Sequence, residues 1–249
     1  MVRAAVESER PTPDSEAILG TLAHDLRNPL APLRTAVELL SRPAVGEESR
    51  QRARAIMSRQ ITEMARLIDE MSEFSRLGSG KVALQRSTLD LGDVVRAALD
   101  QARAAIDEKQ LVLSVELPPD PCVLNADRAR LVQALSMLLG DAARRSERGR
   151  RLWVRAVSAD EGVAIGLRDE ELGLSGDSPA APFTLLPLPG RPLVGDARGA
   201  ARFQSRIGLG FMLAQRLVEL HGGWLQSRSD VPGEGREVVL VLPGQVPAR

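Results

Sequence analysis

The sequence predicts an α+β protein in which a helical hairpin precedes an α/β sandwich with a mixed sheet. Three patterns support this fold class. Apolar residues recur every three or four positions over residues 15–77, which is the period of an amphipathic helix. A short loop at 41–46 divides this region into two helices that would pack antiparallel. From residue 87 onward, short alternating segments interleave with helical ones, as in a sheet covered by helices.

The first predicted helix runs from residue 15 to about residue 40, and Asp14 or Ser15 can cap its N-terminus. The second helix runs from about Glu47 to Leu77. Their apolar stripes are Leu22, Leu26, Leu30, Leu33, Val37 and Leu40 in the first helix, and Ala53, Met57, Ile61, Met64, Ile68 and Met71 in the second. One hairpin leaves this seam half covered, so we expect two copies to pair as a dimeric four-helix bundle. The alternative is a hairpin whose seam packs on the C-terminal domain of its own chain.

The remaining chain predicts a linker over 79–86 and one domain over 87–249. Pro118 and Pro119 end one of its strands, and Gly222 and Gly223 stop its last helix. Residues 170–206 are rich in Gly, Pro and Arg, which is typical of a long functional or disordered loop. Helices are expected at 91–105, 127–145 and 209–221, and strands at 111–117, 123–125, 152–156, 163–167, 224–228 and 238–242.

Composition excludes several classes of function. The 249 residues include 33 basic and 33 acidic side chains, so no net charge favours nucleic acid or a membrane surface. The single cysteine, Cys122, excludes an internal disulfide and fits a reducing compartment. No apolar run reaches the roughly 18 residues of a membrane span. We therefore expect a cytoplasmic protein with neither a nucleic-acid partner nor a membrane span. Residues 1–14 are expected to form a disordered tail, so input would come from an upstream sensor protein or from the dimer.

One of the two histidines lies on the first helix in a distinctive setting. At 100° per residue, His24 is roughly 160° from the middle of the apolar stripe, so its ring is expected to point to solvent. Asp25 follows it, and Asn28 lies one turn further on the same outer face. Pro29 removes the backbone donor that would reach the carbonyl of Asp25. The other interpretation is an ordinary surface histidine on a bundle helix.

The pattern His24, Asp25, Asn28, Pro29 resembles the H-box of bacterial two-component sensor histidine kinases. That resemblance implies a dimerisation and histidine phosphotransfer hairpin over residues 15–78. It also implies that the histidine takes the γ-phosphoryl group of ATP and passes it to an aspartate of a response regulator receiver domain. In the same comparison, Asn28 corresponds to the residue that positions water for dephosphorylating the regulator.

The segment from Gly208 to Gly223 resembles a glycine box of the ATP-binding domain of histidine kinases, whose fold is shared with Hsp90, gyrase and MutL. Gly208 and Gly210 would let the backbone approach phosphate oxygens at a helix N-terminus. His221 corresponds to a helix end in that family, and we interpret it as structural. A further glycine motif over residues 233–235 precedes the last strand.

Other nucleotide positions depart from the family pattern. The asparagine that holds Mg²⁺ in the family falls at Asp141, and Arg144 occupies the place of a phosphate-facing lysine. A carboxylate can still bind Mg²⁺, but at ~4 Å from a phosphate charge it costs roughly 4 kcal/mol at an effective dielectric of about 20. Asp169, expected to bind the adenine amino group, and Gly173 are kept. Two family glycines are replaced, by Glu171 and Arg206.

The resemblance implies a protein histidine kinase that uses ATP and Mg²⁺ to phosphorylate His24, with Asp25 orienting the imidazole. The altered boxes keep a second hypothesis open. In that hypothesis the protein is a non-kinase phosphotransfer or regulator-docking scaffold whose ATP domain is degenerate.

Overall fold

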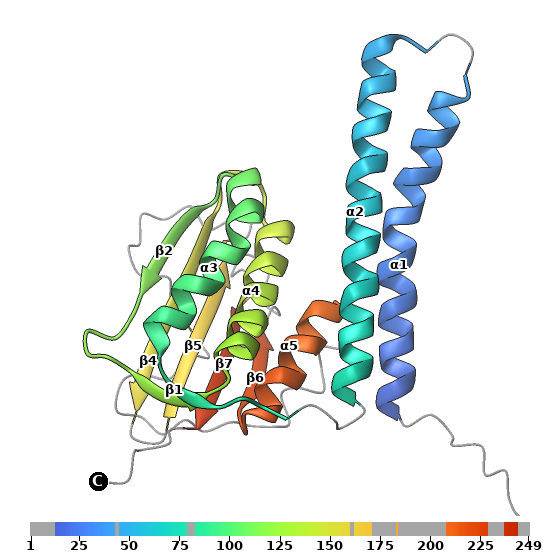
Figure 1. Cartoon of the computed structure of the whole chain (residues 1–249). Coiled ribbons are helices and arrows are strands. Elements are labelled where there is room, and N and C mark those ends of the chain that lie inside the picture. The colour runs from blue at the N-terminus through green and yellow to red at the C-terminus, as the bar shows by residue number, and fades with distance from the viewer. Residues whose placement is uncertain are drawn as a thin grey trace, which may run out of the picture. The chain divides into compact units, whose positions relative to one another are not determined.

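The computed structural model describes residues 13–42, 45–78, 83–159, 162–170, 183, 208–228 and 237–243 (Figure 1). The chain divides into two compact units. One comprises residues 1–73 with 204–209, and the other comprises residues 74–203 with 210–249. Residues 1–12 of the predicted tail over 1–14, most of the predicted loop after residue 170, and the glycine motif at 233–235 lie outside the described residues.

The first unit consists mainly of the predicted hairpin of α1 (Pro13–Leu40) and α2 (Glu47–Gly78), which lie side by side (Figure 1). The last residues of α2, from Phe74 onward, belong to the second unit. The helix begins at Pro13, earlier than the expected cap at Asp14 or Ser15, and proline is well tolerated in a first turn. Pro29 is accommodated inside α1 and buried. Acidic residues in the first turn of α2 and Arg76 in its last turn complement the helix dipole.

Only part of the predicted apolar stripe is buried within one hairpin. Ala53 is fully buried, and so, nearly, is Ala36, which the predicted stripe did not include. By contrast, five members of the predicted stripes keep about half of their surface exposed: Leu30 at 49%, Val37 at 48%, Ile61 at 57%, Ile68 at 55% and Met71 at 47%. An apolar face of this extent remains uncovered by the hairpin itself.

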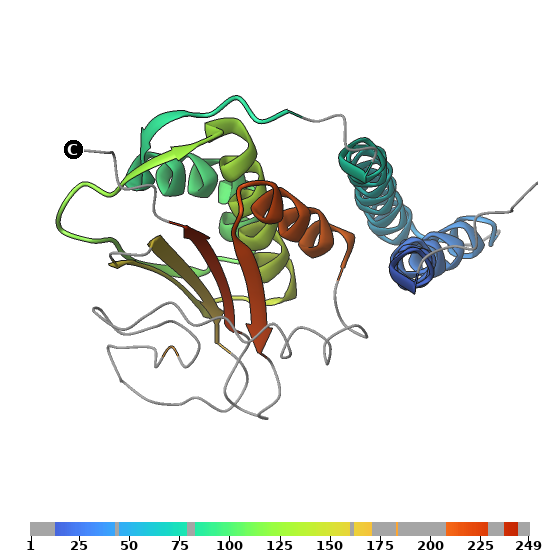
Figure 2. The ribbon, with the colours of Figure 1, turned by 90° about the horizontal axis from the view of Figure 1, so that it is seen from below.

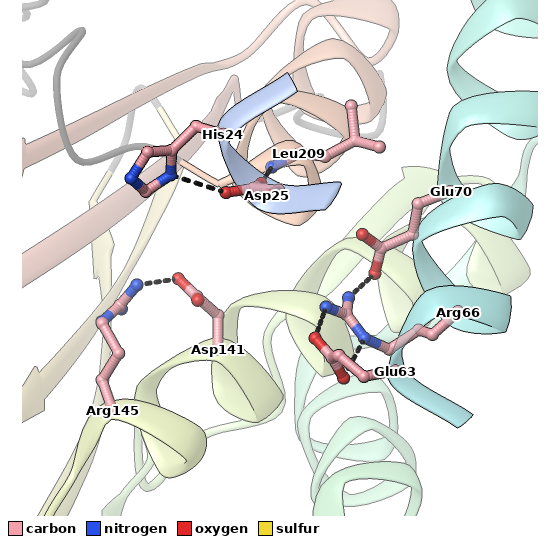
Figure 3. Close-up of polar contacts among 8 residues, drawn as sticks. All are labelled: His24, Asp25, Glu63, Arg66, Glu70, Asp141, Arg145 and Leu209. Atoms are coloured by element: carbon pink, nitrogen blue, oxygen red, sulfur yellow. Dashed lines mark hydrogen bonds and ion pairs between the residues drawn. The ribbon is translucent and has the colours of Figure 1, made fainter. Parts of the chain in front are cut away.

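A charged cluster on α2 is also partly buried. Arg66 Nε donates to Glu63 Oε2 at 3.1 Å, and the same guanidinium pairs with Glu70, which is 6% exposed (Figure 3). Burial acts to lower the pKa of Arg66, but the bonds and charges of Glu63 and Glu70 outweigh it and raise that pKa above its ordinary value. Arg66 therefore stays charged, and its ion pairs with Glu63 and Glu70 link neighbouring turns of α2.

The second unit is an α/β sandwich. Its five-stranded sheet has the order β2-β4-β5-β7-β6, and a separate two-stranded sheet pairs β1 with β3. β2 runs parallel to β4, and every other neighbouring pair is antiparallel. The strands are β1 (Ser87–Asp90), β2 (Val112–Glu116), β3 (Val123–Ala126), β4 (Arg151–Ala159), β5 (Gly162–Asp169), β6 (Trp224–Arg228) and β7 (Glu237–Pro243). The helices are α3 (Leu91–Glu108), α4 (Arg128–Arg145) and α5 (Leu209–Leu220).

The helices of this unit lie on one face of the large sheet (Figure 2). Strand β5 is buried along nearly its whole length, which places it in the middle of the core on both of its faces. On one side, Val157, Ala164, Val239 and Val241 form a cluster against which Phe183 and Trp224 pack. The side chains that complete the core are almost all aliphatic, as the scarcity of aromatic residues predicts.

The α+β fold class is confirmed. The strands predicted at 152–156 and 163–167 lie within β4 and β5, which pair antiparallel with Leu167 opposite Val154. Strand β1 was not predicted, because four residues with a mostly exposed pattern carry little alternation. Within the described ranges, no helix combines the length and the hydropathy that a membrane crossing needs.

Candidate functional site

His24 projects from α1 with 72% of its side chain exposed. Two neighbours contact its Nδ1 atom: Asp25 Oδ1 lies 3.5 Å away, and Asn28 Nδ2 lies 3.4 Å away. Both contacts are to Nδ1 rather than to Nε2. The predicted outward position of the ring agrees with this exposure. The sequence did not predict that Asp25 and Asn28 lie beside the same nitrogen.

The two neighbours of Nδ1 favour different protonation states of the ring. Asp25 is an acceptor, so it favours the tautomer with a proton on Nδ1 and a lone pair on Nε2. The Asn28 amide is a donor toward Nδ1, so it favours a ring whose Nδ1 is unprotonated. Both contacts are long for hydrogen bonds, so neither of them fixes the tautomer of the ring.

Asp25 has a second contact. Residues 204–209 belong to the same compact unit as the hairpin, and within that unit the Leu209 backbone N–H donates to Asp25 Oδ2 at 3.1 Å (Figure 3). Gly208 lies beside the same carboxylate, since a Cβ on it would be 3.5 Å from Oδ2. Asp25 has only 19% of its side chain exposed, and the bond from Leu209 holds its carboxylate independently of His24.

The predicted metal ligand lies on α4 in an ion pair. Asp141 pairs with Arg145 Nη1 one turn further along the helix (Figure 3). Arg144 bends back toward Gly140, where an added Cβ would be 3.2 Å from its Nη1 atom. Sequence reasoning singled out Asp141 and Arg144 but missed Arg145, although the spacing of four residues predicts such a pair on a helix.

These residues do not fit the expected Mg²⁺ site. An Asp141 carboxylate is a suitable oxygen ligand, but the guanidinium of Arg145 already neutralises it. Among the described residues, no group of three or more His, Cys, Asp or Glu side chains is arranged to hold a metal ion. Mg²⁺ binding at Asp141 stays a prediction, and a bound cation would have to displace Arg145 from the carboxylate.

The remaining nucleotide residues are only partly described. Asp169 is the last residue of β5, half-buried and paired in register with Leu152. Gly210 is buried in the first turn of α5. The predictions for Gly173, Glu171 and Arg206 concern residues outside the described ranges, so they stay predictions.

The second histidine has the structural setting that the sequence predicts. His221 is 4% exposed, its Nδ1 donates to the Leu217 carbonyl at 2.7 Å, and its Nε2 accepts the Asp127 backbone N–H at 3.1 Å. Burial lowers the pKa of this imidazole, which keeps the ring neutral as these two bonds require. Asp127 in turn caps α4 by accepting from the Arg130 N–H, and it also accepts the N–H of Gln85. His221 therefore joins the end of α5 to the start of α4.

Comparison with known proteins covers both units. Residues 15–80 match the model of the His Kinase A (phospho-acceptor) domain, which includes His24. Residues 126–246 match the model named Histidine kinase-, DNA gyrase B-, and HSP90-like ATPase. The chain belongs to the histidine kinase family. Both the fold class and the family that the sequence predicted are confirmed.

This histidine kinase family member resembles proteins that are considerably longer. It is 30% identical over 241 residues to the sensor protein DivL of Caulobacter vibrioides, an alignment that covers 96% of this chain and 29% of DivL. It is also 30% identical over 257 residues to the signal transduction histidine-protein kinase/phosphatase MprB of a Mycobacterium species, covering 98% of this chain and 46% of MprB. The chain thus spans less than half the length of these two relatives.

Solved structures support the same fold for this family member. The histidine kinase AdeS of Acinetobacter baumannii superposes with a TM-score of 0.60 at 18% identity, covering 90% of this chain and 98% of AdeS. The histidine kinase ThkA, solved in complex with the response regulator protein TrrA, superposes with a TM-score of 0.63 at 16% identity, covering 91% of this chain and 60% of ThkA.

Proposed function

We propose that this chain is a histidine kinase core that transfers the γ-phosphoryl group of ATP to His24 and then to an aspartate of a response regulator. The observation that carries the proposal is the setting of His24. Its ring is 72% exposed, and its Nδ1 faces Asp25 and Asn28. The match of this segment to a phospho-acceptor domain supports the same role.

The chemistry follows from the two nitrogens of the ring. Asp25 holds the proton on Nδ1, so the Nε2 lone pair attacks the γ-phosphorus while the bond from phosphorus to the ADP oxygen breaks. The Nδ1 proton passes to the Asp25 carboxylate, which acts as the general base. Nδ1 then carries a lone pair, and Asn28 can donate a hydrogen bond to it. Transfer to the regulator reverses these protonation changes as an aspartate oxygen takes the phosphoryl group.

A second candidate function is a phosphotransfer or docking scaffold that no longer turns over ATP. Two observations favour it. Asp141 stands where the family has a metal-binding asparagine, and Glu171 replaces a family glycine. In this case His24 would receive or relay a phosphoryl group without using the C-terminal domain.

We further propose that the chain acts as a homodimer through its hairpin. The half-exposed residues on α1 and α2, from Leu30 to Met71, form the apolar face that a second hairpin would cover. A response regulator receiver domain is the proposed partner of His24, and the complex that ThkA forms with its regulator supports that choice. An upstream sensor protein and a cytoplasmic location remain part of the proposal.

The experiment is phosphorylation of the full chain with [γ-³²P]ATP in a buffer containing MgCl₂. We expect label on the wild type that is lost in acid and kept in alkali, as phosphorus–nitrogen bonds are. We expect His24→Gln to lower the incorporated label by at least 100-fold, whereas Arg148→Gln, which changes an exposed arginine, leaves it unchanged. Label that persists in His24→Gln would show that another residue is the acceptor. An unlabelled wild type that still binds nucleotide would favour the scaffold.

A further inference from the structure

The last two turns of α4 hold a compact group of charges. Asp141 has 19% of its side chain exposed and pairs with Arg145, whose side chain is 36% exposed. Arg144 lies along the same helix and reaches back to Gly140. The guanidinium groups of Arg144 and Arg145 therefore both lie about one helical turn back along α4, next to Gly140 and Asp141 respectively.

The small residue at 140 makes room for this arrangement. Gly140 is buried, and a Cβ there would be 3.2 Å from Arg144 Nη1, closer than most real contacts of a Cβ atom. With Arg144 over Gly140 and Arg145 on Asp141, two guanidinium groups and one carboxylate lie close together on the last turns of α4. A guanidinium keeps its proton at every physiological pH, so both arginines stay positively charged.

A divalent cation at Asp141 would have to displace Arg145 from the carboxylate. The family-type arrangement combines a neutral asparagine with a bound cation, whereas here a carboxylate already has a cation supplied by the chain. We propose that Arg145 serves as the counter-cation of Asp141 in place of magnesium, so that this domain binds the polyphosphate of ADP or ATP without a divalent cation. The proposal rests on the nucleotide binding that the proposed function requires.

The test is calorimetric titration of the full chain with ADP, in one buffer with MgCl₂ and in another with EDTA. For the wild type we expect the two dissociation constants to agree within about threefold. Arg145→Gln removes this counter-cation, so we expect ADP binding in EDTA to weaken at least tenfold and to recover with Mg²⁺, which can then take the place of the guanidinium at Asp141. Arg145→Lys retains the positive charge and should behave as the wild type does.

Arg148→Gln is the matched control. It removes an arginine three residues further on, whose Nε donates to Gln110 Oε1 at 2.9 Å rather than to Asp141. It should leave both dissociation constants unchanged. Thermal unfolding of each variant verifies that it is folded. If Arg145→Gln is not folded, the comparison of the wild type and Arg145→Lys in the two buffers still decides the test.

Two results would overturn this inference and leave the proposed function intact. One is a wild-type affinity for ADP at least tenfold weaker in EDTA than in MgCl₂, and the other is an Arg145→Gln variant that responds to Mg²⁺ as the wild type does. A wild type that binds ADP in neither buffer would overturn the inference and the ATP-dependent function together. Normal ADP binding without phosphorylation of His24 would count only against the proposed kinase activity.

Discussion

His221→Phe is expected to destabilise the second unit through two specific hydrogen bonds. The ring is 4% exposed, and phenylalanine fills a similar volume but can neither accept the Asp127 N–H nor donate to the Leu217 carbonyl. A buried polar group that loses its partner costs about 1–3 kcal/mol. Losing the partner of the Asp127 N–H accounts for most of this cost, because the Leu217 carbonyl has two lone pairs and finds another donor more easily. The expected loss in the free energy of unfolding is therefore about 2–4 kcal/mol.

That loss is large against a typical domain stability of about 5–15 kcal/mol. With a denaturant slope of about 2 kcal/mol per molar urea, the unfolding midpoint should fall by about 1–2 M. Tryptophan fluorescence reports on the relevant unit, because the only two tryptophans, Trp153 and Trp224, lie in its strands β4 and β6. His24→Phe is the matched control, since it changes the exposed histidine of the other unit and should leave this transition in place.

The pH dependence provides a second measurement on the same ring. Burial lowers the pKa of His221 below its ordinary value of 6.5, so the unfolded chain takes up a proton more readily than the folded one. The stability that the neutral ring contributes is therefore fully present above pH 6.5 and declines as the pH falls toward the folded pKa. His221→Phe should lack this component. The reasoning is refuted if the variant unfolds within 0.5 M urea of the wild type, or if its stability falls with pH as steeply.

Two further substitutions test the core and the proposed dimer. Gly223→Ala would place a Cβ 2.2 Å from the Val241 carbonyl oxygen, a backbone atom that cannot move aside, so we expect a loss of at least about 3 kcal/mol by urea unfolding or an insoluble chain. Ile61→Glu combined with Ile68→Glu should convert the dimer to a monomer in light scattering, because each buried isoleucine contributes about 1.5–3 kcal/mol at such an interface. Val123→Glu, at a half-exposed position of the second unit, should leave the dimer intact, and a double variant that remains dimeric would rule out this face as the interface.

Much of the fold could be predicted because the relevant patterns are local. A period of 3.6 residues determines which side of a helix faces its neighbour, so the outward position of His24 follows from the stripe that starts at Leu22. Strands such as β5 can be predicted because their apolar residues lie between residues that favour turns. The structural role of His221 was predicted from the resemblance to histidine kinases, in which the corresponding segment ends a helix, and the two glycines after it are a stop signal that agrees with this.

Other features could not be predicted, because they depend on what long side chains contact and on how many chains assemble. The stripe on α2 includes Ile61 and Ile68 by periodicity, yet a single hairpin leaves both more than half exposed. Periodicity identifies an apolar face but not the molecule that covers it. Likewise, the bonds from Asp127 to the Gln85 N–H and the His221 ring join segments far apart in the sequence, and no spacing rule connects them.

Asp141 shows how one such contact changes a functional argument. From the sequence, a carboxylate at this position repels a phosphate about 4 Å away by roughly 4 kcal/mol at an effective dielectric of about 20, which is the main reason to expect a degenerate ATP site. Arg145 in contact with that carboxylate offers attraction of the same order and opposite sign. Solvent screens both interactions, since the Arg145 side chain is 36% exposed, so they diminish together. The substitution at 141 therefore argues for an altered metal requirement more strongly than for a lost nucleotide site, and this weakens the case for the scaffold.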